Sequence, residues 1–202
     1  MRDILHCDMN NFFASVECKL HPELKGYPVA VCGSVEERHG IVLAKNELAK
    51  ACGVKTAETI ASAKSKCRGL ITVPPHFEEY LKYSRLARSI YERYTDLVEP
   101  FGMDECWLDI SGTRRLFGAP EKVADEIRCT VKEELGLTLH PKKIYLQPAK
   151  IGVPFLGAYI KPNYIMAGKR VLKNFMQKAR GYEKLSKHFR IEKSAIKIEK
   201  NK

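Results

Sequence analysis

The sequence of 202 residues contains no apolar run long enough to cross a membrane, which takes roughly 18 to 20 consecutive apolar residues. Its N-terminal stretch carries Asp3 and Asp8, and acidic residues there are atypical of a secretory signal peptide. We therefore expect a cytoplasmic protein that makes no membrane contact.

Paired cysteines are also absent. The seven Cys residues are scattered without a single CxxC pair, and their number is odd. A disulfide framework favours an even count in a short secreted chain, and a structural zinc site needs closely spaced ligands. We expect seven buried, reduced thiols and no zinc site.

Acidic residues are scarce towards the C-terminus. Residues 140–202 hold 16 Lys and Arg residues but 3 Asp and Glu residues. Residues 1–139 hold 19 Lys and Arg residues and 21 Asp and Glu residues. Such a basic segment is typical either of a polyanion-binding surface or of a solvated chain end. For the last twelve residues, IEKSAIKIEKNK, the second interpretation is favoured.

Residues 1–138 alternate between patterns typical of strands and of amphipathic helices. Residues 3–9 and MDECWLDI, at 103–110, have the character of strands. Apolar residues recur at helical spacing in 77–94, and a second amphipathic helix is expected in 119–136, with Pro120 near its start and Gly136 near its end. This order predicts an α+β fold with helices packed on one face of a sheet.

Carboxylates interrupt two of the apolar, strand-like runs. Asp8 lies in ILHCDMNNFF, and Asp104 and Glu105 lie in FGMDECW. A buried, ionised carboxylate without a partner costs several kcal/mol, so a cation or a set of donors should compensate it. Oxygen ligands of this kind suit magnesium, provided that the two runs are neighbouring strands and bring Asp8 and Asp104 together. The alternative is that Asp104 and Glu105 lie in a surface turn.

Four longer motifs carry a resemblance to a known family. ILHCDMNNFFASVE, GIVLAKNELAKACGVKTAETI, VPPHFEEYLKYSRLARSIYERYTDLVEPFGMDECWLDISG and LFGAPEKVADEIRCTVKEELGLT follow one another in order. Together they resemble the N-terminal half of bacterial Y-family, lesion-bypass DNA polymerases of the polymerase IV type, over residues 1–138. The resemblance implies a polymerase palm with an antiparallel or mixed sheet, formed by 1–22 and 76–138, and an inserted fingers subdomain at 23–75.

The resemblance also implies a metal site and a substrate site. In this family two magnesium ions are held by carboxylates that match Asp8, Asp104 and Glu105, and by the backbone carbonyl at Met9. These ions and the nucleoside triphosphate compensate the carboxylates.

For the substrate, Phe13 matches the aromatic ring that excludes a ribose 2′-hydroxyl, although Phe12 and Phe13 could also be core residues. Lys50 matches a position that lies near the bound triphosphate in this family. Lys45 matches such a position with less support. Glu47 lies where some relatives carry a tyrosine, whose phosphate contact it cannot make.

After Thr138 the chain departs from the polymerase pattern. Residues 139–202 weakly resemble a segment that follows the active site in bacterial reverse transcriptases, but they contain no YxDD motif. A natural fusion and an error of sequence assembly both remain open, and either leaves out the thumb and the C-terminal DNA-gripping domain of the polymerases.

The sequence thus predicts translesion DNA synthesis, in which deoxynucleotides are added to a primer on a DNA template. The alternative is an inactive remnant that binds nucleic acid through its basic tail.

Overall fold

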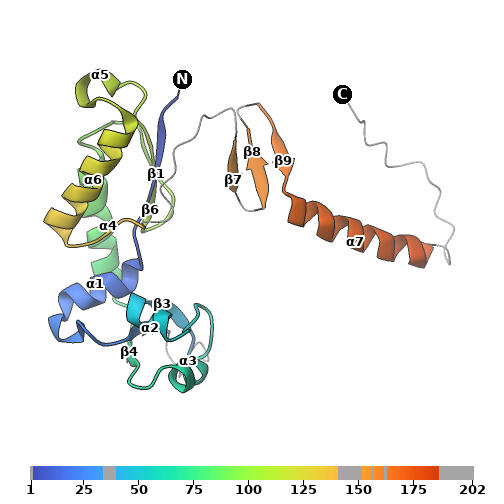
Figure 1. Cartoon of the computed structure of the whole chain (residues 1–202), viewed down its shortest axis with the longest axis horizontal. Helices are drawn as coiled ribbons and strands as arrows, with labels where there is room; N and C mark the ends of the chain where they lie inside the picture. The colour runs from blue at the N-terminus through green and yellow to red at the C-terminus, as the bar shows by residue number, and fades with distance from the viewer. Residues whose placement is uncertain (1, 34–39, 141–151, 156, 162, 187–202) are drawn as a thin grey trace. The chain divides into compact units, whose positions relative to one another are not determined.

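The computed structural model describes residues 2–33, 40–140, 152–155, 157–161 and 163–186. The chain divides into two compact units, Met1–Leu146 and Gln147–Lys202. The first unit contains strands β1 to β6 and helices α1 to α6, and the second contains β7 to β9 and α7 (Figure 1). The last twelve residues of the chain lie outside the described residues.

The first unit is built around an antiparallel sheet in the order β1-β6-β5, with β1 at Ile4–Asp8, β6 at Glu105–Asp109 and β5 at Val98–Pro100. Strand β1 pairs with β6 so that Cys7 is opposite Cys106 and Asp8 is opposite Glu105. Because successive side chains point to opposite faces of a strand, the buried cysteines face the core and the two carboxylates lie on the other face.

Three helices supply the other half of this core: α1 (Phe12–Leu20), α4 (Phe77–Tyr91) and α6 (Pro120–Leu135). Helix α6 buries Val123, Ile127, Val131 and Leu135, a four-residue spacing that keeps one stripe against the core. It ends at Gly136, whose φ of 65° is the left-handed conformation that glycine adopts readily at a helix end. A short helix, α5 (Arg114–Phe117), precedes α6.

A second, smaller sheet has the order β3-β2-β4 and its own hydrophobic cluster. Its strands are β2 (Val29–Cys32), β3 (Val42–Lys45) and β4 (Ile71–Val73), its helices are α2 (Glu47–Ala51) and α3 (Ile60–Lys66), and the 3-10 turn η1 (Pro22–Leu24) leads into it. Asn46 caps α2 and Thr59 caps α3, each side chain accepting a backbone N–H of the first turn.

The two clusters correspond to the palm and fingers expected from the sequence, and the α+β architecture is confirmed. The borders of these subdomains stay a prediction. The first unit runs on to Leu146, and Leu139 is buried in the larger core, although the sequence had assigned it to the tail.

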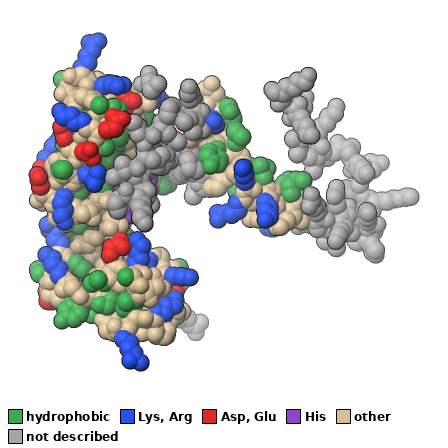
Figure 2. Space-filling view, viewed as in Figure 1, with side chains coloured by type: hydrophobic (Ala, Val, Ile, Leu, Met, Phe, Trp, Pro, Cys, Tyr) green, Lys and Arg blue, Asp and Glu red, His purple; other side chains and the backbone are tan. Residues whose placement is uncertain are grey.

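The second unit holds a three-stranded antiparallel sheet, β7 (Val153–Phe155), β8 (Ala158–Ile160) and β9 (Ile165–Ala167), followed by α7 (Lys169–Ser186). Its surface mixes basic and hydrophobic side chains (Figure 2). Ile165 is 71% exposed and Phe175 is 55% exposed.

Two further expectations can be compared with the structure. All seven cysteines are free thiols, but the expectation that all are buried is wrong for three of them. Cys52, which follows α2, and Cys129, on the outer face of α6, are exposed, and Cys18 is partly buried. None of the helices in the described part of the chain is both long enough and apolar enough to span a bilayer.

Candidate active site

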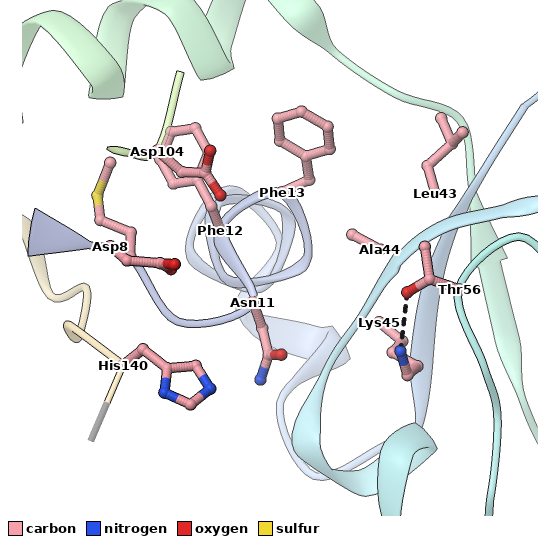
Figure 3. A pocket seen from close by; sticks show the side chains of 11 residues that line it. Asp8, Asn11, Phe12, Phe13, Leu43, Ala44, Lys45, Thr56, Asp104 and His140 are labelled. Atoms are coloured by element: carbon pink, nitrogen blue, oxygen red, sulfur yellow. Dashed lines mark hydrogen bonds between the residues drawn. The ribbon is translucent and has the colours of Figure 1, made fainter. Parts of the chain in front are cut away.

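A pocket of about 340 Å³ lies within the first unit and draws its lining from both sheets and from α1. In Figure 3, Asp8, Asp104 and His140 occupy one side of the view, Lys45 and Thr56 the other, with Asn11 and Phe13 between them. The lining residues are Asp8, Met9, Asn11, Phe12, Phe13, Leu43, Ala44, Lys45, Thr56, Asp104 and His140.

Backbone hydrogen bonds hold the two aspartates at this pocket. Asp8 is the last residue of β1 and is 5% exposed, and Asp104 immediately precedes β6. The N–H of Met9 donates to the Asp104 carbonyl at 3.0 Å, and the N–H of His140 donates to the Asp8 carbonyl at 2.8 Å. The structure therefore brings Asp8, Met9 and Asp104 together, as the metal-site hypothesis requires.

Glu105 is directed elsewhere. It is opposite Asp8 in the sheet but is not among the pocket-lining residues, and its Oε2 lies 3.3 Å from Nε2 of His6. The His6 ring stacks on Trp107 with centroids 4.2 Å apart. Burial and the nearby carboxylates of Asp8 and Asp104 raise the pKa of Glu105, while His6 opposes this shift.

The donors present suit a hard cation. Asp8 and Asp104 offer carboxylate oxygens in one pocket, and next to it the pKa of Glu105 is raised, first by burial and then by the neighbouring carboxylates. Within the described residues, however, no three His, Cys, Asp or Glu side chains already stand together as a metal site. The assignment of Asp8, Met9, Asp104 and Glu105 as metal ligands stays a prediction.

The two phenylalanines differ in their surroundings. Phe12 is 3% exposed and belongs to the core, although one edge reaches the pocket. Phe13 is half-buried and stacks on Tyr80 with ring centroids 4.3 Å apart. The Tyr80 hydroxyl in turn donates to Glu17, a fully buried carboxylate that also contacts His76 at 3.0 Å. Phe13 thus presents a supported ring to the pocket.

The two candidate phosphate cations are placed differently. Lys45 lines the pocket, and its Nζ donates to Thr56 Oγ1 at 3.0 Å. Burial, followed by the charge of Lys50, lowers the pKa of Lys45. Lys50 does not line the pocket, and its Nζ lies 3.2 Å from Glu47 Oε1.

Sequence reasoning did not single out Asn11, Thr56 or His140. Each lines the pocket, but they lie far apart in the sequence. Asn11 had the detectable signal of a residue just before a helix, whereas Thr56 and His140 carried no local signal because long-range contacts bring them here.

Known proteins resemble this chain over most of its length. Residues 7–140 match the sequence model of the impB/mucB/samB family. The chain is 61% identical over 138 residues to DNA polymerase IV of Acetivibrio thermocellus, covering 68% of this chain and 35% of that protein. It is 40% identical over 161 residues to DNA polymerase IV of Moorella thermoacetica, covering 79% of this chain and 40% of that protein. The chain thus spans roughly two-fifths or less of the length of these relatives.

Solved structures show the same relationship. The crystal structure of DinB from Sulfolobus solfataricus matches with a TM-score of 0.63 and 27% identity, covering 69% of this chain and 40% of that one. An insertion ternary complex of Dbh DNA polymerase matches with a TM-score of 0.62 and 28% identity, covering 69% and 41%. Through residues 7–140 the chain belongs to the impB/mucB/samB family, and its structural neighbours are Y-family DNA polymerases.

Proposed function

We propose that this chain carries the palm and fingers of a translesion DNA polymerase and acts in the cytoplasm on a DNA primer-template with deoxynucleoside triphosphates. The observation that carries the proposal is the composition of one pocket. It combines two aspartates, a cation and an aromatic ring at the N-terminus of α1. The similarity to DNA polymerase IV proteins over the same residues supports it.

The acidic side of the pocket suits the primer end and the metal. Asp8 and Asp104, with the Met9 carbonyl and with Glu105 after a side-chain rotation, would hold two magnesium ions. Such ions activate an attacking hydroxyl and neutralise charge on the reacting phosphate. The hydrogen bonds from Met9 and His140 fix the backbone of both aspartates, which supports this proposal.

The opposite side suits the nucleotide. The first backbone N–H groups of a helix have no intrahelical partner and favour an anion, so the N-terminus of α1 can receive phosphate oxygens together with Lys45. Phe13, supported from behind by Tyr80, would lie beneath the sugar and clash with a 2′-hydroxyl. This arrangement would select deoxynucleotides.

Primer extension on an undamaged template with magnesium tests the proposal directly. The parent protein should add deoxynucleotides, and Asp104→Ala should abolish addition while the circular dichroism spectrum stays unchanged. Asp125→Ala, which removes an exposed carboxylate paired with Arg128 on α6, is the matched control and should retain activity. Equal extension by Asp104→Ala and the parent would refute the assignment.

One observation favours a second candidate function, nucleic-acid binding without catalysis. The described side chains of α7 include Lys169, Arg170, Lys173 and Lys178, all exposed. A basic helix of this kind can bind a phosphate backbone irrespective of sequence. DNA binding by a protein that gives no extension in the assay above would favour this candidate.

A further inference from the structure

One carboxylate links the palm and the fingers beside the pocket. Glu47, in the first turn of α2, accepts hydrogen bonds through Oε1 from the Asn11 side-chain amide at 2.8 Å and from the Asn10 amide at 3.4 Å. The same oxygen lies 3.2 Å from the Lys50 ammonium. Glu47 therefore gathers three donor groups from two parts of the first unit.

Asn11 contacts Glu47 without also capping α1. Asn11 occupies the N-cap position of α1 in a left-handed conformation, with φ 50° and ψ 39°, and its side chain makes no capping hydrogen bond. A capping asparagine ordinarily satisfies a free N–H of the helix. Here the amide nitrogen of Asn11 donates to Glu47, and the residue lines the pocket.

The three donors held by Glu47 are of the chemical kind that binds phosphate, and one of them, Asn11, lines the pocket. Ammonium and amide N–H groups donate to phosphate oxygens, and a charged donor forms the stronger bonds. Lys50 stands one helical turn from Glu47, so the carboxylate partly neutralises the charge of Lys50. The carboxylate of Glu47 also repels an arriving anion.

We propose that Glu47 lowers the affinity of the pocket for nucleoside triphosphates by competing for their phosphate donors, so that a bound triphosphate displaces the Glu47 carboxylate from Lys50 and Asn11. This inference rests on the proposed function and adds a residue that sets substrate affinity. A purely structural role is the alternative, because a carboxylate in the first turn of a helix also stabilises that helix.

Binding of dATP and of inorganic tripolyphosphate, measured by calorimetry in magnesium buffer, tests the competition. Glu47→Gln keeps an acceptor for the two amides but removes the charge. It should bind both ligands about fivefold more tightly than the parent at low salt, a factor in the range of exposed charge pairs. The gain should shrink as salt is added.

A second variant makes the test independent of folding losses. Lys50→Met should lower affinity less in the parent, where Glu47 already engages Lys50, than in the Glu47→Gln background, where it should remove most of the gain. Glu79→Gln is the matched control, because Glu79 forms an equivalent i,i+3 pair with Lys82 away from the pocket. It should bind both ligands like the parent.

The outcomes separate the two proposals. If the parent binds dATP and Glu47→Gln binds it equally or more weakly, the inference is wrong and the proposed function stands. If Glu47→Gln gains affinity for tripolyphosphate but neither protein binds dATP, the proposed function fails alone. Absence of binding of either ligand by both proteins overturns both. A loss of affinity on Lys50→Met that is equal in both backgrounds also overturns the competition.

Discussion

Single charged residues determine what the pocket can hold. The carboxylates of Asp8, Asp104 and Glu105 lie at the adjoining ends of β1 and β6, and the pKa of Glu105 is raised by burial and, in addition, by the charges of the two aspartates. Lys45 and the N-terminus of α1 supply the opposite sign. Negative and positive groups therefore lie on different sides of one pocket. Such a pocket suits a ligand whose phosphates meet Lys45 and which binds a cation at the aspartates.

The crowding predicts a pH-dependent change in stability for Asp104→Ala in metal-free buffer. A folded-state pKa of Glu105 above the ordinary 4.5 means that its contribution is present at lower pH and is lost as pH rises from about 4.5 through the raised value. Removing Asp104 removes one cause of the shift. The melting temperature of the variant relative to the parent should therefore increase between pH 4 and pH 7. A constant or falling difference would contradict this explanation.

Phe13 predicts a change in sugar selection. Phe13→Ala removes the ring beneath the expected sugar position, so the ratio of ribonucleotide to deoxynucleotide insertion should rise. Phe77→Ala is the control, since Phe77 meets Phe13 edge-on with centroids 6.0 Å apart but does not line the pocket. Single-nucleotide insertion kinetics measure both ratios. An unchanged ratio in Phe13→Ala would mean that Phe13 serves the core alone.

At the scale of elements, the fingers depend on a few polar contacts because their sheet and helices are short. Asn46 joins α2 to β2 and to the residues just before β2. Its Oδ1 accepts the N–H groups of Ala49 and Val29, both at 3.0 Å, and its Nδ2 donates to the Tyr27 carbonyl at 2.8 Å. One side chain therefore caps α2 and fixes the start of β2.

Asn46→Ala should destabilise the fingers by about 2 kcal/mol, since it removes a helix cap and leaves further backbone groups without a partner. Thr59→Ala, which removes the cap of α3 alone, should cost about 1 kcal/mol. Hydrogen exchange of the fingers amides should report both losses in this order, with the palm amides little changed. Equal losses would show that the additional contacts of Asn46 contribute nothing.

At the scale of the whole molecule, charge is divided between the two units. Residues 1–146 carry 21 Lys and Arg against 21 Asp and Glu, and residues 147–202 carry 14 against 3. Because Leu139 pairs with Met9 and the His140 N–H bonds to Asp8, the chain up to His140 belongs structurally to the palm. A cut after Leu146 therefore separates the basic unit without removing these contacts.

This division predicts that DNA affinity resides mainly in the second unit. With about five phosphate contacts, a fourfold increase in salt should weaken duplex binding by roughly two to three powers of ten. Truncation after Leu146 should remove most of the affinity and most of the salt dependence, as measured by fluorescence anisotropy. Truncation after Thr138 should also lower the melting temperature, because it removes the Leu139 pairing. Unchanged binding after either cut would assign the DNA grip to the first unit.

Local patterns in the sequence were sufficient for much of this description. Alternation of apolar residues predicted strands at 3–9 and 103–110, because every second side chain of a strand faces the same side. A spacing of three and four residues predicted α4 and α6, because such residues share one face of a helix. The motifs around Asp8 and Asp104 predicted the family, which the comparisons confirm. These features depend on residues close together in the chain.

The tertiary structure decided how side chains are distributed around the pocket. Lys45 lines it whereas Lys50 pairs with Glu47, and Glu105 contacts His6 whereas Asp104 reaches the pocket. His140 reaches the pocket because the chain beside it pairs with the end of β1, which is separated from it by almost the whole sequence of the first unit. No local pattern encodes these outcomes, because adjacent residues on a strand point to opposite faces and the pocket is closed by segments that only folding brings together.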